Sequence, residues 1–216
     1  MRRTKRHEHT RAGFTIIEIL VSVSVLGIAF ASISMVAQAN MRAHSVGALE
    51  VSMESQVTDT VDRVIEELRL AGRETVTVGG TSNSIQYELP LGLSPLDSSM
   101  MWDQPRLIRF EYEAGEINDG VDNNGNGLVD EGLVVLIEEL GTVNERRLVL
   151  SRWVREVAAG ELPNGIDDNG DGRIDESGFS LTRQGSTVSV HLTLERIVEH
   201  GPALQSSAET SVKLRN

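Results

Sequence analysis

The chain has 216 residues, a formal net charge of −12 and no cysteine, and 39% of its residues are hydrophobic. This length and hydrophobic content are enough for a folded core, so wholesale disorder is excluded. The absence of cysteine excludes disulfides, thiolate metal sites and cysteine nucleophiles. The acidic balance argues against nucleic-acid binding by the globular part, because nucleic-acid-binding proteins contact phosphates through basic patches.

The first 13 residues form a basic leader in which Glu8 is the only acid. An apolar stretch follows and continues to Ala39, with Glu18 as its only charged residue. About 20 residues that rise 1.5 Å each span a hydrocarbon core of roughly 30 Å. The sequence therefore predicts a transmembrane segment at about residues 14–39. The basic leader predicts a cytoplasmic N-terminus, an inner-membrane location and a periplasmic remainder.

Two interpretations of this segment need no further motif. The first is a single-pass signal anchor in which Glu18 is tolerated near the membrane face. The second is a secretory signal peptide cut at Ala29-Phe30-Ala31. The second is disfavoured because a carboxylate in an apolar signal segment costs roughly 2–3 kcal/mol. The apolar stretch also runs past that cleavage point.

A third interpretation accounts for Glu18. The run Gly13-Phe14-Thr15-Ile16-Ile17-Glu18 resembles the processing signature of type IV prepilins and type II secretion pseudopilins. The resemblance implies that a prepilin peptidase cuts between Gly13 and Phe14 and methylates the new amine of Phe14. Glutamate at the fifth mature position is the signature of this family. Other pilin or pseudopilin subunits and an inner-membrane assembly platform are the implied partners, and a pilus or pseudopilus is the implied destination.

Glu18 also has a physical reason to take part in assembly. Its carboxylate lies in apolar surroundings and needs a cation, and the amine of a processed Phe14 on a neighbouring subunit would supply one. Removing one partner from a buried ion pair costs roughly 3–5 kcal/mol. The pair would therefore fix the register between subunits, as the family resemblance implies.

After the membrane segment, apolar residues recur at steps of three and four. They are Val46, Leu49, Met53, Val57, Val61, Val64 and Leu68. This spacing predicts a helix with one apolar stripe, and Gly72 is a plausible stop. One long helix is therefore expected over residues 14–72. A coiled-coil stalk over residues 43–71 is the weaker alternative, because sustained heptad charges are missing.

From residue 73 onward, apolar and polar residues alternate in short runs separated by turn residues. The runs cover residues 85–89, 108–112, 133–140, 148–154, 188–194 and 212–214. This pattern predicts an antiparallel sheet, one face of which covers the amphipathic half of the helix. The predicted fold class is α+β and pilin-like, with an extracytoplasmic domain at residues 73–216.

Two further segments are similar to larger minor subunits of the same family. Asp62–Arg73 looks like the end of the long helix in PilW-like minor pilins and in the J-type minor pseudopilin. The closing segment, Val212–Asn216, looks like their last strand. These resemblances imply a minor rather than a major subunit.

Residues 119–131 and 164–176 are near copies 45 residues apart, with four and five acids. Oxygen-bearing residues at alternate positions before a glycine resemble the start of an EF-hand-type calcium loop, and more closely thrombospondin type 3 and dockerin repeats. The side chains of Asp122, Asn124, Asn126 and Asp130 and the Leu128 carbonyl are the expected ligands of the first loop. Those of the second loop are Asp167, Asn169, Asp171 and Asp175 and the Arg173 carbonyl.

These loops depart from the EF-hand pattern at the twelfth position, where Leu133 and Gly178 stand instead of an acid. Either Glu131 and Glu176 or the upstream pair of Asp119 and Asn164 must complete the ligand shell. Hard oxygen donors favour Ca²⁺, so two calcium sites are predicted. The alternative is a pair of metal-free turns, because turns need the same residues. Gly160–Pro163 is interpreted as a connector into the second loop.

The sequence has no Ser/His/Asp grouping and no phosphate-binding glycine loop, so a structural role rather than an enzyme is predicted. The expected function is that of a minor pilin or pseudopilin subunit that initiates or joins a filament. The alternative is a membrane-anchored, calcium-dependent binding module that does not polymerise.

Overall fold

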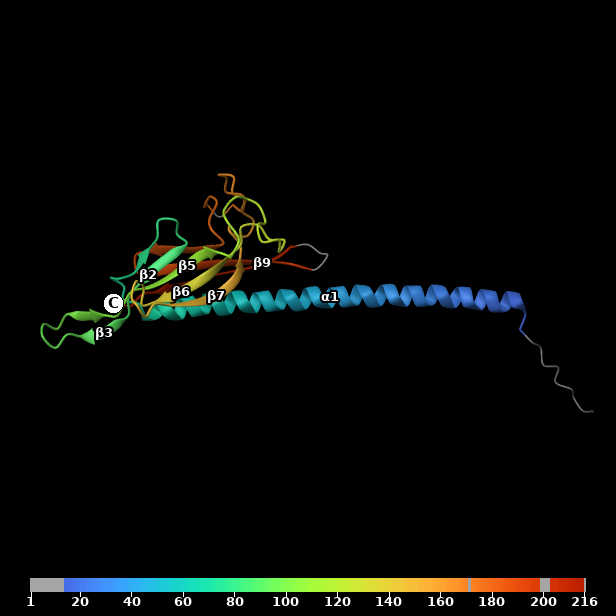
Figure 1. Cartoon of the computed structure of the whole chain (residues 1–216), viewed down its shortest axis with the longest axis horizontal. Coiled ribbons are helices and arrows are strands. Elements are labelled where there is room, and N and C mark those ends of the chain that lie inside the picture. Colours follow the sequence, from blue (N-terminus) through green and yellow to red (C-terminus); the bar gives the residue numbers. More distant parts are fainter. Residues whose placement is uncertain (1–13, 171, 199–202, 216) are drawn as a thin grey trace, which may run out of the picture. The chain divides into compact units, whose positions relative to one another are not determined.

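The structure is a computed structural model that describes residues 14–170, 172–198 and 203–215. The predicted leader, including Gly13, lies outside these residues. The chain divides into two compact units, Met1–Gly47 and Ala48–Asn216. A single helix, α1, covers Ile16–Leu70 and contributes to both units (Figure 1). The predicted long helix is therefore present, with both ends two residues inside the expected bounds.

In the first unit, helix α1 exposes its apolar side chains on all sides. Every Ile, Leu, Val, Phe and Met from Phe14 to Met41 is exposed. The most apolar window of 18 residues has a mean hydropathy of 2.4, which is enough to cross a membrane by length and composition. Ser22, Ser24 and Ser32 each donate to the carbonyl four residues back, at 2.7–2.9 Å. Their hydroxyl groups are thereby satisfied inside the helix, as a lipid environment requires.

The second unit contains an antiparallel sheet of eight strands in the order β1-β2-β5-β6-β7-β9-β10, with β8 also paired to β9. The strands are β1 (Thr77–Val78), β2 (Ser84–Tyr87), β5 (Arg106–Tyr112), β6 (Gly132–Glu138), β7 (Arg146–Val154), β8 (Phe179–Gln184), β9 (Thr187–Ile197) and β10 (Ala203–Lys213). Strands β3 (Pro90–Leu93) and β4 (Met100–Trp102) form a separate hairpin. The α+β prediction is confirmed.

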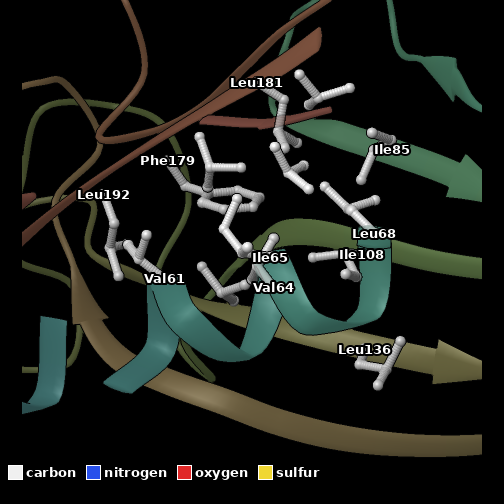
Figure 2. Close-up of a cluster of buried hydrophobic side chains, with 14 of the residues drawn as sticks. Val61, Val64, Ile65, Leu68, Ile85, Ile108, Leu136, Phe179, Leu181 and Leu192 are labelled. Atoms are coloured by element: carbon white, nitrogen blue, oxygen red, sulfur yellow. The ribbon is translucent and has the colours of Figure 1, made fainter. Parts of the chain in front are cut away.

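The main core lies between the second half of α1 and one face of the sheet. Figure 2 shows Val61, Val64 and Leu68 of α1 among side chains of the strands. Met53 and Val57 continue the same buried stripe. A stripe of spacing three and four presents one side of a helix to a sheet, so burial follows directly from the sequence pattern.

A small polar cluster forms a second link between α1 and the sheet. The Tyr87 hydroxyl donates to the Glu67 carboxylate at 2.9 Å, and Arg106 contacts the same oxygen at 3.1 Å. Arg106 also pairs with Glu138 at 3.1 Å. Tyr87 is fully buried, and burial together with the nearby Glu67 charge raises the pKa of its phenol. The cluster gives the buried phenol an acceptor, which it needs away from water.

Strand β6 is buried on both faces. The face that points away from α1 is covered by a separate group of side chains. Leu133, Val135 and Ile137 form an apolar cluster there. Glu111 on β5 pairs with Arg147 on β7, the strand on the other side of β6, and with Arg109 on its own strand. Because long side chains cover apolar surface with their aliphatic parts, these pairs help to shield β6 from water.

Strand pairing places both acidic loops at the same end of the sheet. Tyr112, the last residue of β5, pairs with Gly132, the first residue of β6, and Gly132 also pairs with Val154, the last residue of β7. The first loop joins β5 to β6, and the second joins β7 to β8. Both loops therefore leave the sheet from the row that contains Tyr112, Gly132 and Val154.

Candidate functional site

Glu18 lies in the first turn of α1, where it takes part in a capping box. Thr15 precedes the first helical residue, and its hydroxyl accepts from the Glu18 backbone N–H at 3.3 Å. The Glu18 carboxylate reaches back to the Thr15 backbone N–H at 3.5 Å. This reciprocal arrangement stabilises a helix N-terminus. Glu18 and Phe14 are both exposed, so within one chain the carboxylate has a local role and remains accessible.

The first acidic loop folds around two of its predicted ligands, Asp122 and Asp130. Both oxygens of Asp122 accept backbone hydrogen bonds, from Gly125 at 2.6 Å and from Gly127 at 2.7 Å. The Asp130 carboxylate accepts from the backbone of Asp119 and Gly120 at 3.3 and 2.7 Å. The loop is thus closed by carboxylates that bind its own N–H groups.

The asparagines of the first loop connect to its last acid. The Asn124 side-chain oxygen accepts from the Asn126 backbone at 3.0 Å, and that of Asn126 accepts from the Leu128 backbone at 2.8 Å. The amide groups of both asparagines donate to the same oxygen of Glu131. Glu131, Asn124 and Asn126 are therefore brought together by hydrogen bonds within the loop.

The second loop repeats this arrangement. Asp167 accepts from Gly170 and Gly172 at 2.6 and 2.9 Å, and Asp175 accepts from Asn164 and Gly165 at 3.1 and 2.8 Å. The Asn169 amide donates to Glu176 at 3.2 Å. These contacts match those of the first loop position by position. The two loops therefore have the same local backbone structure as well as similar sequences.

Arg173 and Asp171 complete the predicted set of the second loop. The Arg173 side chain lies 3.9 Å from Glu209 on β10, so it points to a neighbouring strand while its backbone stays in the loop. Asp171 lies outside the residues that the structure describes. In the described ranges, no three histidine or acidic side chains form a group arranged to hold a metal ion. Asparagine and backbone oxygens would have to complete either site.

Glu116 and Glu161 are loop residues that the sequence interpretation missed. Glu161 is fully buried, and its carboxylate accepts from the backbone of Asn169 at 2.9 Å and of Asp175 at 3.3 Å. It is therefore part of the second loop, and the interpretation of residues 160–163 as a connector is wrong. Glu116 is its counterpart, 5% exposed, and accepts from Asn124 at 2.7 Å. The available signal was the tripeptide Ala-Gly-Glu, which occurs at 114–116 and again at 159–161.

The first loop buries a high density of negative charge. Asp130 and Glu131 are each 1% exposed. One oxygen of Glu131 and one of Glu116 are buried without a hydrogen-bond partner in the described part of the chain. A buried carboxylate oxygen that lacks a partner is unfavourable, because it has lost its hydration. A positive charge or additional hydrogen-bond donors next to these oxygens would therefore stabilise the loop.

A tyrosine hydrogen bond joins the two segments that lead from the sheet into the acidic loops. The Tyr112 hydroxyl donates to Glu156 at 3.2 Å. Burial raises the pKa of the Glu156 carboxyl above its usual value, and the nearby Asp130 charge adds to the effect. Burial and the charge of Glu156 likewise raise the pKa of Tyr112 to about 12. The charge of Asp130 in the first loop therefore acts on Glu156, which lies in the segment that leads into the second loop.

Residues 9–34 match the family model of the prokaryotic N-terminal methylation motif. The match covers the end of the leader, the predicted cleavage point, Glu18 and the apolar part of α1 up to residue 34. It indicates a prepilin-type, processed protein of the type IV pilin and pseudopilin kind. Together with the exposed apolar helix, it fits a membrane-anchored, structural protein rather than an enzyme.

The chain also has a partial similarity to a curated enzyme. It is 29% identical over 105 residues to the phosphoribosylformylglycinamidine cyclo-ligase of Oceanobacillus iheyensis. The aligned region is 45% of this chain and 31% of that enzyme, so the chain spans less than a third of the length of this relative. At this identity and coverage, the similarity does not transfer an activity to this chain. No solved structure matches the chain.

Proposed function

We propose that this chain is a minor structural subunit of a type IV pilus or of a type II secretion pseudopilus. In this proposal a prepilin peptidase cuts between Gly13 and Phe14, and the mature subunit then joins or initiates a filament. The observation that carries the proposal is the methylation motif at residues 9–34, most of whose described part lies on helix α1, where the apolar side chains are exposed on all sides.

The exposed apolar surface explains why such a subunit needs two successive environments. A helix that is apolar all round is stable only when lipid or protein covers it. Before assembly the membrane would cover residues 16–39, with the globular unit in the periplasm. After assembly the same surface would be covered by the helices of neighbouring subunits, and an inner-membrane platform would transfer it from one environment to the other.

Glu18 is the proposed assembly residue. Its carboxylate is exposed and caps its own helix with a long hydrogen bond of 3.5 Å. That weak contact leaves it free to exchange Thr15 for the charged amine of Phe14 on a neighbouring subunit. In the packed centre of a filament this ion pair would be cut off from water, and losing one partner would cost about 3–5 kcal/mol.

The capping box allows a sharp test of the ion pair, because glutamine can replace glutamate in a capping box but carries no charge. The test introduces Glu18→Gln and Glu18→Ala into the chain in its own host and measures the subunit in sheared filaments. The proposal predicts that both variants are processed normally and that both fail to enter filaments. Thr15→Ala, which removes the cap but keeps the charge, is the control and should enter filaments.

The possible outcomes separate the roles. Normal incorporation of Glu18→Gln together with failure of Glu18→Ala would mean that Glu18 acts only as a helix cap. Absence of the wild-type subunit from filaments, with the processed chain found only in membranes, would favour a membrane-anchored binding module that does not polymerise. A subunit present at a small fraction of the major subunit supports the minor role.

A further inference from the structure

We propose that each acidic loop is a calcium site that begins at a buried glutamate, Glu116 or Glu161, and ends at Glu131 or Glu176. In this proposal the last glutamate supplies the carboxylate that is missing from the twelfth position. The first glutamate is a positioning residue, since it binds the backbone of the loop. The site is independent of leader processing and of filament assembly.

The buried, partner-less oxygen of Glu131 is the observation that points to an ion. One oxygen of this carboxylate accepts from the side chains of Asn124 and Asn126, two predicted ligands, so the carboxylate faces the inside of the loop. Its other oxygen is buried, and no donor from the described residues reaches it. Glu116 has a second such oxygen at the start of the same loop. A divalent cation bound by Glu131 would satisfy the free oxygen of that carboxylate and would offset the negative charge of Glu116 beside it.

The other side-chain oxygens of the first loop are held in place by hydrogen bonds but can still bind an ion. Each oxygen of Asp122 accepts one backbone hydrogen bond, as does the side-chain oxygen of Asn126. Carboxylate and amide oxygens have two lone pairs, so each keeps one for an ion. The backbone N–H groups therefore hold the ligands in place before an ion arrives, which reduces the entropy cost of binding.

The donor set selects the metal. It consists of carboxylate, amide and backbone oxygens, with no sulfur and no histidine in either loop. Such donors prefer Ca²⁺ to Zn²⁺ or Cu²⁺. Mg²⁺ demands a tight octahedron, whereas Ca²⁺ accepts six to eight oxygens in irregular geometry. Loops closed by glycines such as Gly125 and Gly127, both at positive φ, offer the irregular geometry.

The test uses the full-length chain in detergent, stripped with a chelator and titrated with CaCl₂ in a calorimeter. We expect two calcium ions per chain, little binding of MgCl₂, and a rise in melting temperature of about 5–10 °C per occupied site at saturation. Glu131→Gln should remove one ion and Glu176→Gln the other. Glu66→Gln, the same change at an exposed position on α1, is the matched control and should keep both.

Calcium binding by the unchanged loop of a variant serves as the check that the variant is folded. If Glu131→Gln still binds one ion in the second loop, the chain is folded and the loss is local. Asp122→Ala, at a partly exposed position, provides a second variant with less risk to the core, and it should lower the affinity of the same site at least tenfold. Lack of calcium binding by the folded wild-type chain would overturn the proposal. So would two ions retained in both glutamine variants.

Discussion

The carboxylates of Glu116 and Glu161, 45 residues apart, accept the same hydrogen bond in two different loops. Glu116 binds the backbone N–H of Asn124 at 2.7 Å, and Glu161 binds that of Asn169 at 2.9 Å. Both acids are buried. The duplicated unit therefore includes Glu116 and Glu161, three residues before the segments that show the acidic spacing.

The role of Glu161 in the second loop can be tested by truncation. Glu161→Ala removes the buried carboxylate that accepts from the Asn169 and Asp175 N–H groups, and a hydrogen bond to a charged group contributes about 1.5–3 kcal/mol. We therefore expect the free energy of unfolding to fall by about 2 kcal/mol in denaturant titrations. Glu209→Ala, at a side chain that is 51% exposed, should change it by less than about 0.5 kcal/mol. Equal effects of the two variants would show that Glu161 is no more than a connector residue.

The packing of α1 on the sheet gives a second prediction. Leu68 is fully buried, whereas Leu70, two residues further on and on nearly the opposite side of the helix, is 55% exposed. Leu68→Ala should lower the stability of the second unit by about 3 kcal/mol, because it leaves a cavity against the sheet. Leu70→Ala should lower it by less than about 0.5 kcal/mol. Similar losses in the two variants would contradict the orientation of the helix.

The raised pKa values of the two tyrosines predict that the free energy of unfolding decreases at alkaline pH. Burial raises the pKa of both phenols, that of Tyr112 to about 12 and that of Tyr87 further. In the unfolded chain both titrate near pH 10. The folded state therefore holds its protons more tightly, and the free energy of unfolding should fall as pH rises from about 10 towards 12. Below about pH 10 this contribution is complete.

Ultraviolet absorbance of tyrosinate measures this effect directly. The folded chain should show little tyrosinate at pH 10.5, and the chain in guanidinium should show most of its tyrosines ionised. Tyr112→Phe should leave only the later titration of Tyr87. Titration of a folded phenol near pH 10 would contradict the buried position of that side chain.

The loops also predict a pattern of chemical ageing. Asn124 and Asn169 each precede a glycine, a flexible sequence that deamidates readily. If calcium binds their side-chain oxygens, it should restrain them. Peptide mapping should then find slower deamidation in calcium than in chelator. Equal rates would support metal-free turns.

Most of the fold was predictable because its signals are local and periodic. The stripe from Met53 to Leu68 is buried as expected. The predicted runs at residues 108–112, 133–140 and 148–154 correspond to β5, β6 and β7. Strand β8 (Phe179–Gln184) was missed because it is short and carries a mixture of polar and apolar residues. The hairpin of β3 and β4 was missed because Pro90 and Gly92 resemble loop residues.

The candidate sites were predictable only in part. The motif from Gly13 to Glu18 could be identified because its residues are consecutive. The spacing of acidic and asparagine residues in each loop could be identified because the loop repeats. Glu116 and Glu161 were missed because a lone glutamate before a turn is usually solvated, and only folding places it under the loop. The link from Tyr112 to Glu156 joins strand ends that are far apart in sequence, so no local pattern reveals it.

We propose that the mature chain begins at Phe14 as a prepilin-type subunit. The most direct measurement is the mass of the N-terminal peptide of the chain isolated from its own membranes, compared with that of a Gly13→Asp variant. We predict a peptide that starts at N-methylated Phe14 in the wild type and an intact leader in the variant. A wild-type chain that retains Met1 would instead be an unprocessed signal anchor, and one that starts near Ala31 would be the product of a secretory signal peptidase; either start would contradict cleavage after Gly13.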